Sequence, residues 1–215
     1  CFYLLGVSPD AQSVDIFRAS LVLILGLLFW LMSLFLLAGY PENSELWNDE
    51  SKIALMGVLV LVPTFVGVVV LKYLLPSGFL VLALVILVAA ADVGAYFVGV
   101  NFGSRKLAAS LSPKKSWEGV WGGLALSLIV AAGFIWALHN YLTALSTIQV
   151  LSLLALSVGV TFFSVVGDLI ESMLKRNCGV KDSGAILPGH GGVLDRVDGL
   201  VAATPVFVLA MMLVL

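Results

Sequence analysis

Long stretches without a single Asp, Glu, Lys or Arg are the feature that most restricts how this chain folds. They cover residues 19–40, 53–71, 73–91, 119–167 and 199–215. A helix needs roughly 20 apolar residues to cross the hydrocarbon core of a bilayer, and each stretch is about that long or longer. Composition agrees, since 61% of the residues are hydrophobic and 11% are charged, whereas soluble domains carry about 25% charged residues. The sequence therefore predicts an integral membrane protein.

The same composition excludes several other classes of protein. Disordered chains and nucleic-acid-binding domains need charge and polarity that this chain lacks, so we expect no nucleic-acid partner. Cys1 and Cys178 lie far apart and outside any CxxC or Cys/His pattern, which gives little support to a disulfide or a zinc site. Because the chain begins and ends within apolar runs, we expect it to be trimmed from a longer protein.

The uncharged stretches indicate six spans. A polar interruption at 139–143 divides the longest stretch into two helices joined by a short turn. The breaker cluster Pro-Ser-Gly at 76–78 predicts a turn over 72–78. The next helix should then run from about residue 79 to 99, with Asp92 close to its end. The predicted fold class is all-α, a polytopic integral membrane protein with about six transmembrane helices after an N-terminal stub.

The distribution of basic residues predicts an orientation. Taken alternately, the connections on one side hold nine Lys and Arg residues and those on the other side hold two. The basic connections are 42–52, 101–118 and 168–198. Cytoplasmic connections carry the excess of Lys and Arg. We therefore expect these connections, and a polar cavity that opens toward them, to face the cytoplasm.

One predicted helix carries polar side chains along a single face. They recur every three or four residues: Thr161, Ser164, Asp168, Glu171 or Ser172, and Lys175. Ionisable groups that face lipid are costly, so this stripe is typical of a helix that lines a water-filled or substrate-filled cavity. Alternatively, Asp168 and Glu171 only mark the place where the helix leaves the bilayer. The stripe alone does not decide between these interpretations.

Two further segments concentrate polar chemistry. Residues 175–199 combine glycines, which let backbone amides approach an anion, with bases that neutralise phosphate and carboxylates that suit Mg²⁺. The alternative is an ordinary connecting loop with turn glycines. Residues 112–119 read SPKKSWEG. Their paired lysines either set the topology and anchor the helix or hold a phosphate near the headgroup plane.

The segment 172–198 resembles the signature of the phosphatidate cytidylyltransferases, also called CDP-diacylglycerol synthases. It reads SMLKRNCGVKDSGAILPGHGGVLDRVD. SPKKSWEG and the segment ADVGAY around Asp92 are also similar to that family. Residues 1–90 resemble it only in their hydrophobic character. We therefore expect N-terminal membrane helices over 1–90 and a C-terminal catalytic membrane domain over 91–215.

This resemblance implies a reaction in a bacterial inner membrane, in which CTP and phosphatidic acid give CDP-diacylglycerol and pyrophosphate with Mg²⁺. It assigns the metal-binding acids to Asp168 and Asp195. Asp92 is expected to be a third metal ligand that points into the same cavity, the alternative being a helix-end residue. A second cation and a homodimer are left open.

The remaining site residues are expected from the charge of the two substrates, because bases must reduce the repulsion between two anions that react. The expected catalytic residues are Asp168, Asp195, Lys175 and Arg196. The expected substrate-binding residues are Ser112, Lys114, Lys115, Ser172, Arg176, Lys181, Asp182, His190, Gly191, Gly192 and Asp198. Among them, Lys114 and Lys115 are assigned to the lipid phosphate.

Two other functions fit part of the sequence. A CTP-dependent lipid kinase of the polyprenol or dolichol type shares the membrane setting and the nucleotide, but it releases CDP instead of pyrophosphate. A transporter also has intramembrane acids and helices interrupted by Gly or Pro, but it consumes no CTP and has no need for a loop rich in bases. The Asp-Gly-x-x-Ala-Arg element of the CDP-alcohol phosphotransferases is absent from the sequence.

Overall fold

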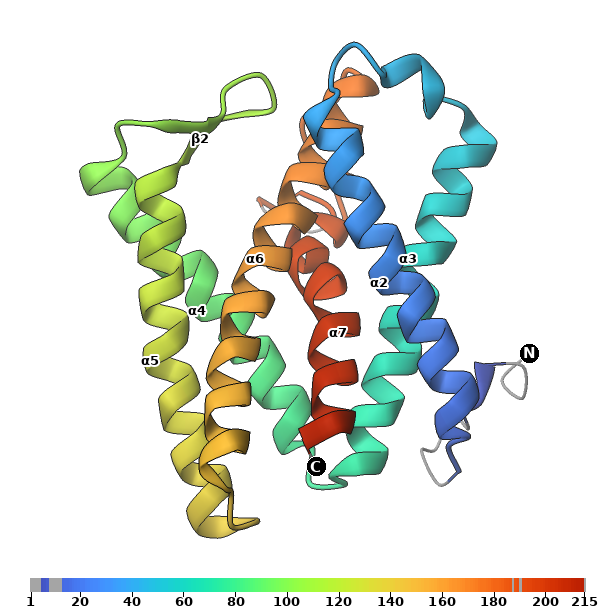
Figure 1. Ribbon diagram of the computed structural model, residues 1–215. Coiled ribbons are helices and arrows are strands. Elements are labelled where there is room, and N and C mark those ends of the chain that lie inside the picture. Colours follow the sequence, from blue (N-terminus) through green and yellow to red (C-terminus); the bar gives the residue numbers. More distant parts are fainter. Residues whose placement is uncertain (1–4, 8–12, 187, 190, 215) are drawn as a thin grey trace.

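Six long helices make up most of the structure (Figure 1). The computed structural model describes residues 5–7, 13–186, 188–189 and 191–214. The helices are α2 (Ile16–Ala38), α3 (Glu50–Leu74), α4 (Phe79–Phe102), α5 (Trp117–Tyr141), α6 (Thr147–Asn177) and α7 (Leu194–Val214). Each of the six is long and apolar enough to cross a membrane. The prediction of an all-α polytopic membrane protein is confirmed.

Most helix ends lie where the sequence predicts them. α4 begins directly after the Pro-Ser-Gly breaker, whose Gly78 adopts the left-handed φ of 78° that favours glycine. The turn between α5 and α6 falls at the polar interruption, and Ser146 and Gln149 form a reciprocal capping box at the start of α6. The predicted boundary between the N-terminal membrane helices and the catalytic domain, at residues 90 and 91, falls inside α4. The functional difference between these two parts stays a prediction.

The prediction of one loop over residues 175–199 is wrong at both ends. α6 continues to Asn177, and α7 already begins at Leu194, so the connection covers only residues 178–193. The helix dipole accounts for both extensions. Lys175 and Arg176 lie in the last turn of α6, where positive charge is favourable, and Asp195 lies in the first turn of α7, where negative charge is favourable. The charged end of the signature is therefore helical.

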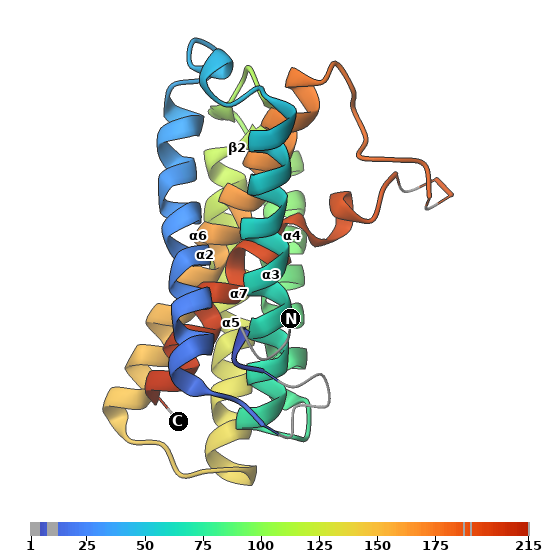
Figure 2. The same cartoon turned by 90° about the vertical axis from the view of Figure 1, so that its right-hand side faces the viewer.

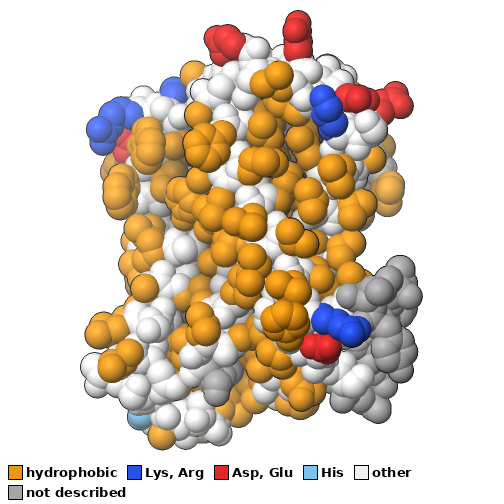
Figure 3. All heavy atoms as spheres, turned by 45° about the vertical axis from the view of Figure 1, so that its right-hand side comes forward, with side chains coloured by type: hydrophobic (Ala, Val, Ile, Leu, Met, Phe, Trp, Pro, Cys, Tyr) orange, Lys and Arg blue, Asp and Glu red, His pale blue; other side chains and the backbone are white. Residues whose placement is uncertain are grey.

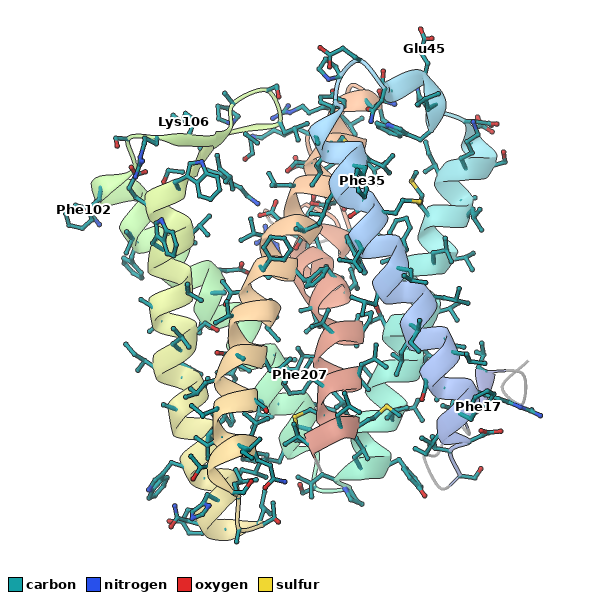
Figure 4. All side chains as sticks on the ribbon, viewed as in Figure 1. Phe17, Phe35, Glu45, Phe102, Lys106 and Phe207 are labelled. Atoms are coloured by element: carbon teal, nitrogen blue, oxygen red, sulfur yellow. The ribbon has the colours of Figure 1, made fainter. Side chains whose placement is uncertain are left out.

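α6 and α7 form the centre of the bundle, with α4 and α5 on one side and α2 and α3 on the other (Figure 1). In the most apolar part of α6 and α7 half of the residues are buried, against 17% to 39% in the other four helices. The outward faces are apolar as well. Figure 4 shows Phe17 and Phe35 on α2, which are 72% and 77% exposed, while Phe207 of α7 is buried. Figure 3 shows a broad hydrophobic band across one face.

The polar connections gather at one end of the bundle. This end carries the α2–α3 connection, with the short 3-10 helix η1 (Ser44–Leu46), and an antiparallel hairpin of β1 (Lys106–Ala108) and β2 (Ser112–Ser116). Glu45 and Lys106 mark this end in Figure 4. The α6–α7 loop leaves from the same end, projects outward from the bundle and returns to it lower down, where α7 begins (Figure 2). The hairpin is a small addition to the all-α prediction, and the side of the membrane that this end faces stays a prediction.

α4 and α5 approach closely where their glycines meet. A Cβ on Gly94 would lie 2.5 Å from the Gly122 carbonyl oxygen, and a Cβ on Gly123 would lie 2.5 Å from that of Ala91. Small residues that allow such backbone contact are what hold helices together in lipid, where the hydrophobic effect between helices is absent. The contact fixes the position of Asp92, which follows Ala91 on α4.

Gly94→Ala is expected to lower the free energy of unfolding by about 1–3 kcal/mol, because the new methyl group meets a backbone carbonyl and forces the helices apart. Gly57→Ala is the matched control, since a Cβ on this glycine of α3 meets nothing within 4 Å. The measurement is denaturant-induced unfolding of both variants in detergent micelles. Equal stability of the two variants would contradict the tight α4–α5 contact.

Candidate active site

Three carboxylates from two helices come together within the described part of the chain. Asp168 and Glu171 lie on α6 and Asp198 lies on α7, and one carboxylate oxygen of each lies within 4.8 Å of the other two. Asp168 and Glu171 are three residues apart and therefore share a helix face. Glu171 is only 5% exposed, while Asp168 and Asp198 are half-buried. We call these three residues the acid cluster.

Two glycines bring α6 and α7 together at the level of the acid cluster. A Cβ on Gly199 would lie 2.5 Å from the Ser164 hydroxyl oxygen, and a Cβ on Gly167 would lie 2.8 Å from the Ala202 Cβ. A Cβ on Gly167 would also clash with the Asp198 backbone carbonyl oxygen, so this position has no room for a side chain. At Gly199 the Ser164 side chain would have to rotate. Because Gly167 directly precedes Asp168 and Gly199 directly follows Asp198, the same contact brings the two carboxylates together.

Asp92 approaches the acid cluster from α4. Its carboxylate faces the Ser164 hydroxyl and lies close enough to Asp168 and Lys115 for direct electrostatic interaction. The side chain is exposed although it lies within a membrane-spanning helix. A carboxylate that faced lipid would be costly. The position favours the interpretation that the polar stripe lines an opening filled with water or substrate.

The β-hairpin brings Lys115 to the acid cluster. The Lys115 ammonium forms an ion pair with Asp168 Oδ2, and both side chains are half-buried. Lys114, its neighbour on β2, is exposed. The two lysines of the SPKKSWEG segment therefore differ in their surroundings, because successive side chains of a strand point to opposite faces.

The hairpin is held at its base and at its tip. Glu118, in the first turn of α5, accepts hydrogen bonds from the backbone N–H groups of Ser104 and Arg105, both at 3.2 Å. At the tip Leu111 is 4% exposed within an apolar cluster that includes residues of α6. Its carbonyl oxygen accepts a hydrogen bond of 3.4 Å from Arg176 Nε. These contacts hold Lys115 in place.

Asp195 anchors the α6–α7 loop. Its Oδ2 accepts hydrogen bonds from the Ser183 N–H at 2.9 Å, the Ser183 hydroxyl at 2.8 Å and the Gly192 N–H at 2.7 Å. Its Oδ1 lies 2.6 Å from Lys175 Nζ, and the same ammonium lies 2.7 Å from Glu171 Oε2. Lys175 thus links the anchor of the loop to the acid cluster.

The structure separates the acids that the sequence predicts as metal ligands. Asp168 is a member of the acid cluster, and Asp92 lies beside it. Asp195 is linked to the cluster through Lys175 and lies beside Glu171, while its Oδ2 accepts hydrogen bonds from the loop. Asp198, predicted to bind substrate, instead lies in the acid cluster. The roles of all four acids stay predictions.

The other predicted site residues surround the acid cluster at different places. The Ser172 hydroxyl donates to Asp168 Oδ1 at 3.4 Å, and Ser112 lies on β2 with the two lysines. The exposed groups are Arg176 at the end of α6, Lys181 and Asp182 in the loop, and Arg196 in the first turn of α7. Gly191 has the left-handed φ of 81°, and Gly192 donates to Asp195. His190 lies outside the described residues.

Sequence reasoning gave no site role to two acids that the structure places in this region. Glu171 belongs to the acid cluster, and Glu118 holds the base of the hairpin. A signal for Glu171 was present in its spacing, three residues after Asp168 and four before Lys175. No comparable signal exists for Glu118, because its partners lie in a preceding irregular segment.

The donor set of this site fits a hard divalent cation. Carboxylate oxygens are the ligands that Mg²⁺ prefers, often with substrate phosphates completing the coordination. The ammonium groups of Lys115 and Lys175 are shared among Asp168, Glu171 and Asp195. Asp92 and Asp198 add two further carboxylates to the same region. A divalent cation would reduce the repulsion within this group.

Comparison with known proteins gives a consistent result. The sequence profile described as "Cytidylyltransferase family" matches residues 1–214. A phosphatidate cytidylyltransferase of Pseudomonas aeruginosa is 48% identical over 189 residues, which cover 88% of this chain and 68% of that protein. A phosphatidate cytidylyltransferase of Haemophilus influenzae is 42% identical over 212 residues, which cover 95% of this chain and 73% of that protein. A phosphatidate cytidylyltransferase of Mycobacterium tuberculosis is 36% identical over 167 residues, which cover 75% of this chain and 47% of that protein.

Asp195→Asn is expected to loosen the α6–α7 loop, because hydrogen bonds to a charged acceptor contribute about 1.5–3 kcal/mol each and this carboxylate accepts several. The backbone N–H groups of Ser183 and Gly192 should exchange with deuterium at least about tenfold faster. The measurement is hydrogen–deuterium exchange of the detergent-solubilised protein. Asp182→Asn, at an exposed carboxylate of the same loop, is the control. Unchanged exchange in Asp195→Asn would contradict the anchoring role.

Proposed function

The chain belongs to the cytidylyltransferase family, and we propose that it transfers CMP from CTP to phosphatidic acid, giving CDP-diacylglycerol and pyrophosphate. The observation that carries this proposal is the acid cluster, with Lys115 paired to it, inside a bundle of membrane-spanning helices. The phosphates of both substrates are negative and need positive charge nearby. Carboxylates can provide it indirectly, by holding a divalent cation in the site. The family does not favour a lipid kinase or a transporter.

In the proposed reaction a phosphate oxygen of phosphatidic acid attacks the α-phosphorus of CTP. A bond forms between that oxygen and the α-phosphorus, and the bond from the α-phosphorus to the bridging oxygen of the β-phosphate breaks. Pyrophosphate leaves with the electron pair. A phosphate monoester has its second pKa near 6, so it is already ionised at neutral pH and needs no general base. Positioning and charge neutralisation supply the catalysis.

Asp168 and Asp198 are proposed to hold Mg²⁺, with Asp92 beside them. A bound Mg²⁺ would supply positive charge that neutralises the phosphates of CTP. Asp195 is joined to the acid cluster by the Lys175 ammonium, which contacts its Oδ1. An incoming triphosphate would attract this ammonium away from the carboxylate. We therefore propose that Asp195 and Lys175 change partners when the nucleotide binds.

The bases of the site divide between the two substrates. Lys115 already contacts a carboxylate of the acid cluster, so transfer of its ammonium to a lipid phosphate exchanges one oxyanion partner for another. Lys114 is proposed to act on the same phosphate. The bases proposed for the triphosphate and the leaving pyrophosphate are Lys175, Arg176, Lys181 and Arg196. They lie at the end of α6, in the following loop and at the start of α7.

The end of the bundle that carries the hairpin is proposed to face the cytoplasm of a bacterial cell, with the protein in the inner membrane. Support comes from the excess of Lys and Arg in the connections at this end and from the bacterial relatives. The acyl chains of phosphatidic acid would stay in the lipid while the headgroup enters from the side, near the exposed Asp92. Assembly into a homodimer stays a prediction.

Asp168→Asn is expected to lower the turnover number on the order of 100-fold or more. Loss of a residue that only hydrogen-bonds to a metal ligand already lowers metal affinity or activity by about 10–100-fold. The assay combines the purified protein with CTP, phosphatidic acid and Mg²⁺ and identifies both products. Pyrophosphate with CDP-diacylglycerol supports the proposal, and CDP with a phosphorylated lipid contradicts it. Glu45→Gln, on the exposed η1, should behave as wild type.

Lys115→Gln is expected to raise the apparent KM for phosphatidic acid by about 10–100-fold, because it removes a charge-assisted contact of about 1.5–3 kcal/mol. The KM for CTP should change little. Both constants are measured in mixed micelles, with Lys72→Gln in the last turn of α3, at the other end of the bundle, as the control. A weakened CTP affinity with an unchanged lipid KM would assign Lys115 to the nucleotide instead.

A further inference from the structure

Within the described residues, Glu171 has a carboxylate oxygen without a hydrogen-bond partner, in the least exposed part of the acid cluster. Its side chain is 6% exposed, and its Oε2 lies 2.7 Å from Lys175 Nζ. Its Oε1 is buried and has no hydrogen-bond partner within the described residues. A buried acceptor without a partner costs free energy, and the cost is larger for a charged group. The sequence predictions and the proposed catalytic roles leave this oxygen unexplained.

The unpartnered oxygen belongs to a group that already meets other acids. One carboxylate oxygen of Glu171 lies within 4.8 Å of oxygens of Asp168 and Asp198. Such proximity of like charges is unfavourable unless a cation lies among them or one carboxylate holds a proton. Three other buried side-chain atoms lack a partner in the described structure, and they belong to the neutral groups of Trp30, Ser127 and Asn177. The Glu171 oxygen is thus the one of this set that belongs to an ionisable group.

A purely structural role as partner of Lys175 does not account for the second oxygen. Lys175 uses Oε2 of Glu171 and, at 2.6 Å, Oδ1 of Asp195. The ion pair therefore needs one oxygen of Glu171 and leaves the other buried and without a hydrogen-bond partner among the described residues. The spacing along α6 places the Glu171 carboxylate between Asp168, one turn before it, and Lys175, one turn after it.

We propose that Glu171 is a ligand of the divalent cation, through Oε1, together with Asp168 and Asp198. Its Oε2 at the same time keeps the Lys175 ammonium beside that ion. The inference concerns the same site as the proposed function, but it depends on cation binding alone and not on the identity of the substrates.

The test measures Mn²⁺ binding to the purified full chain in detergent, without CTP or lipid, by electron paramagnetic resonance of free Mn²⁺. Glu171→Gln keeps the size of the side chain and an acceptor for Lys175 but removes the charge. It should weaken Mn²⁺ binding at least about tenfold, because even outer partners of metal ligands are worth about 10–100-fold. Glu45→Gln, the same substitution at an exposed position, should bind Mn²⁺ as the wild type does.

The variant Lys175→Met distinguishes two roles of Glu171, as a ligand of the cation or only as the partner of Lys175. If Glu171 only positioned Lys175, removal of either group would weaken Mn²⁺ binding alike. If Glu171 is a ligand, Lys175→Met should bind Mn²⁺ at least as tightly as the wild type, because a positive charge next to the ion has been removed. Equal weakening in Lys175→Met and Glu171→Gln would overturn the proposal.

Wild-type affinity in Glu171→Gln would also overturn the proposal, as would the absence of Mn²⁺ binding to the wild-type protein. Thermal unfolding with and without Mn²⁺ is a second readout, because a cation that binds the folded state raises its stability. The Mn²⁺-dependent stabilisation should be smaller in Glu171→Gln than in Glu45→Gln.

Should Glu171→Gln fail to fold, Glu171→Asp retains the charge and withdraws the oxygens by one methylene, and wild-type affinity in that variant would overturn the proposal. Product analysis with CTP and phosphatidic acid judges the proposed function separately. The Mn²⁺ measurements and the product analysis therefore test the two proposals independently of each other.

Discussion

The cost of charge inside a bilayer is the constraint on which the rest of this structure depends. Ionisable side chains within membrane-spanning helices must face one another, water or a substrate, because lipid offers them no partner. Asp92, Asp168, Glu171 and Asp198 lie on three different helices and share one region. The apolar outward faces of the bundle are the other consequence of the same constraint (Figure 3). A cluster of ionisable groups is possible here because the helices turn these side chains toward one another.

Glycine contacts convert this constraint into a defined geometry. Gly167 and Gly199 bring α6 and α7 together beside Asp168 and Asp198, and Gly94 brings α4 against α5 next to Asp92. Helices in lipid associate through close packing of small residues, so these contacts stabilise the bundle and at the same time set the distances between the acids. Stability and site geometry therefore depend on the same few backbone contacts.

Positive charge reaches the acid cluster from two directions. Lys115 arrives on the hairpin, which Glu118 and the tip at Leu111 hold in place, and Lys175 arrives one helical turn after Glu171. Each ammonium already pairs with carboxylates, so in the proposed reaction the substrate phosphates would replace existing partners of these lysines. This arrangement limits the electrostatic cost of the site before the substrates bind, and it separates the base proposed for the lipid from the base proposed for the nucleotide.

The sequence by itself determined the membrane-spanning class, the approximate limits of six helices and the polar face of α6, because each of these depends on local composition or on helical spacing. The segment 172–198 also indicated the family without any structure. Only the tertiary structure decided which acids meet, since Asp92 and Asp198 are far apart in the sequence and become neighbours through helix packing. It also decided that the charged end of the signature is helical, that a hairpin carries Lys115, and that one buried oxygen of Glu171 has no hydrogen-bond partner among the described residues. Spacing along one helix predicts a shared face, but the group that this face meets depends on contacts between helices, which no local pattern encodes.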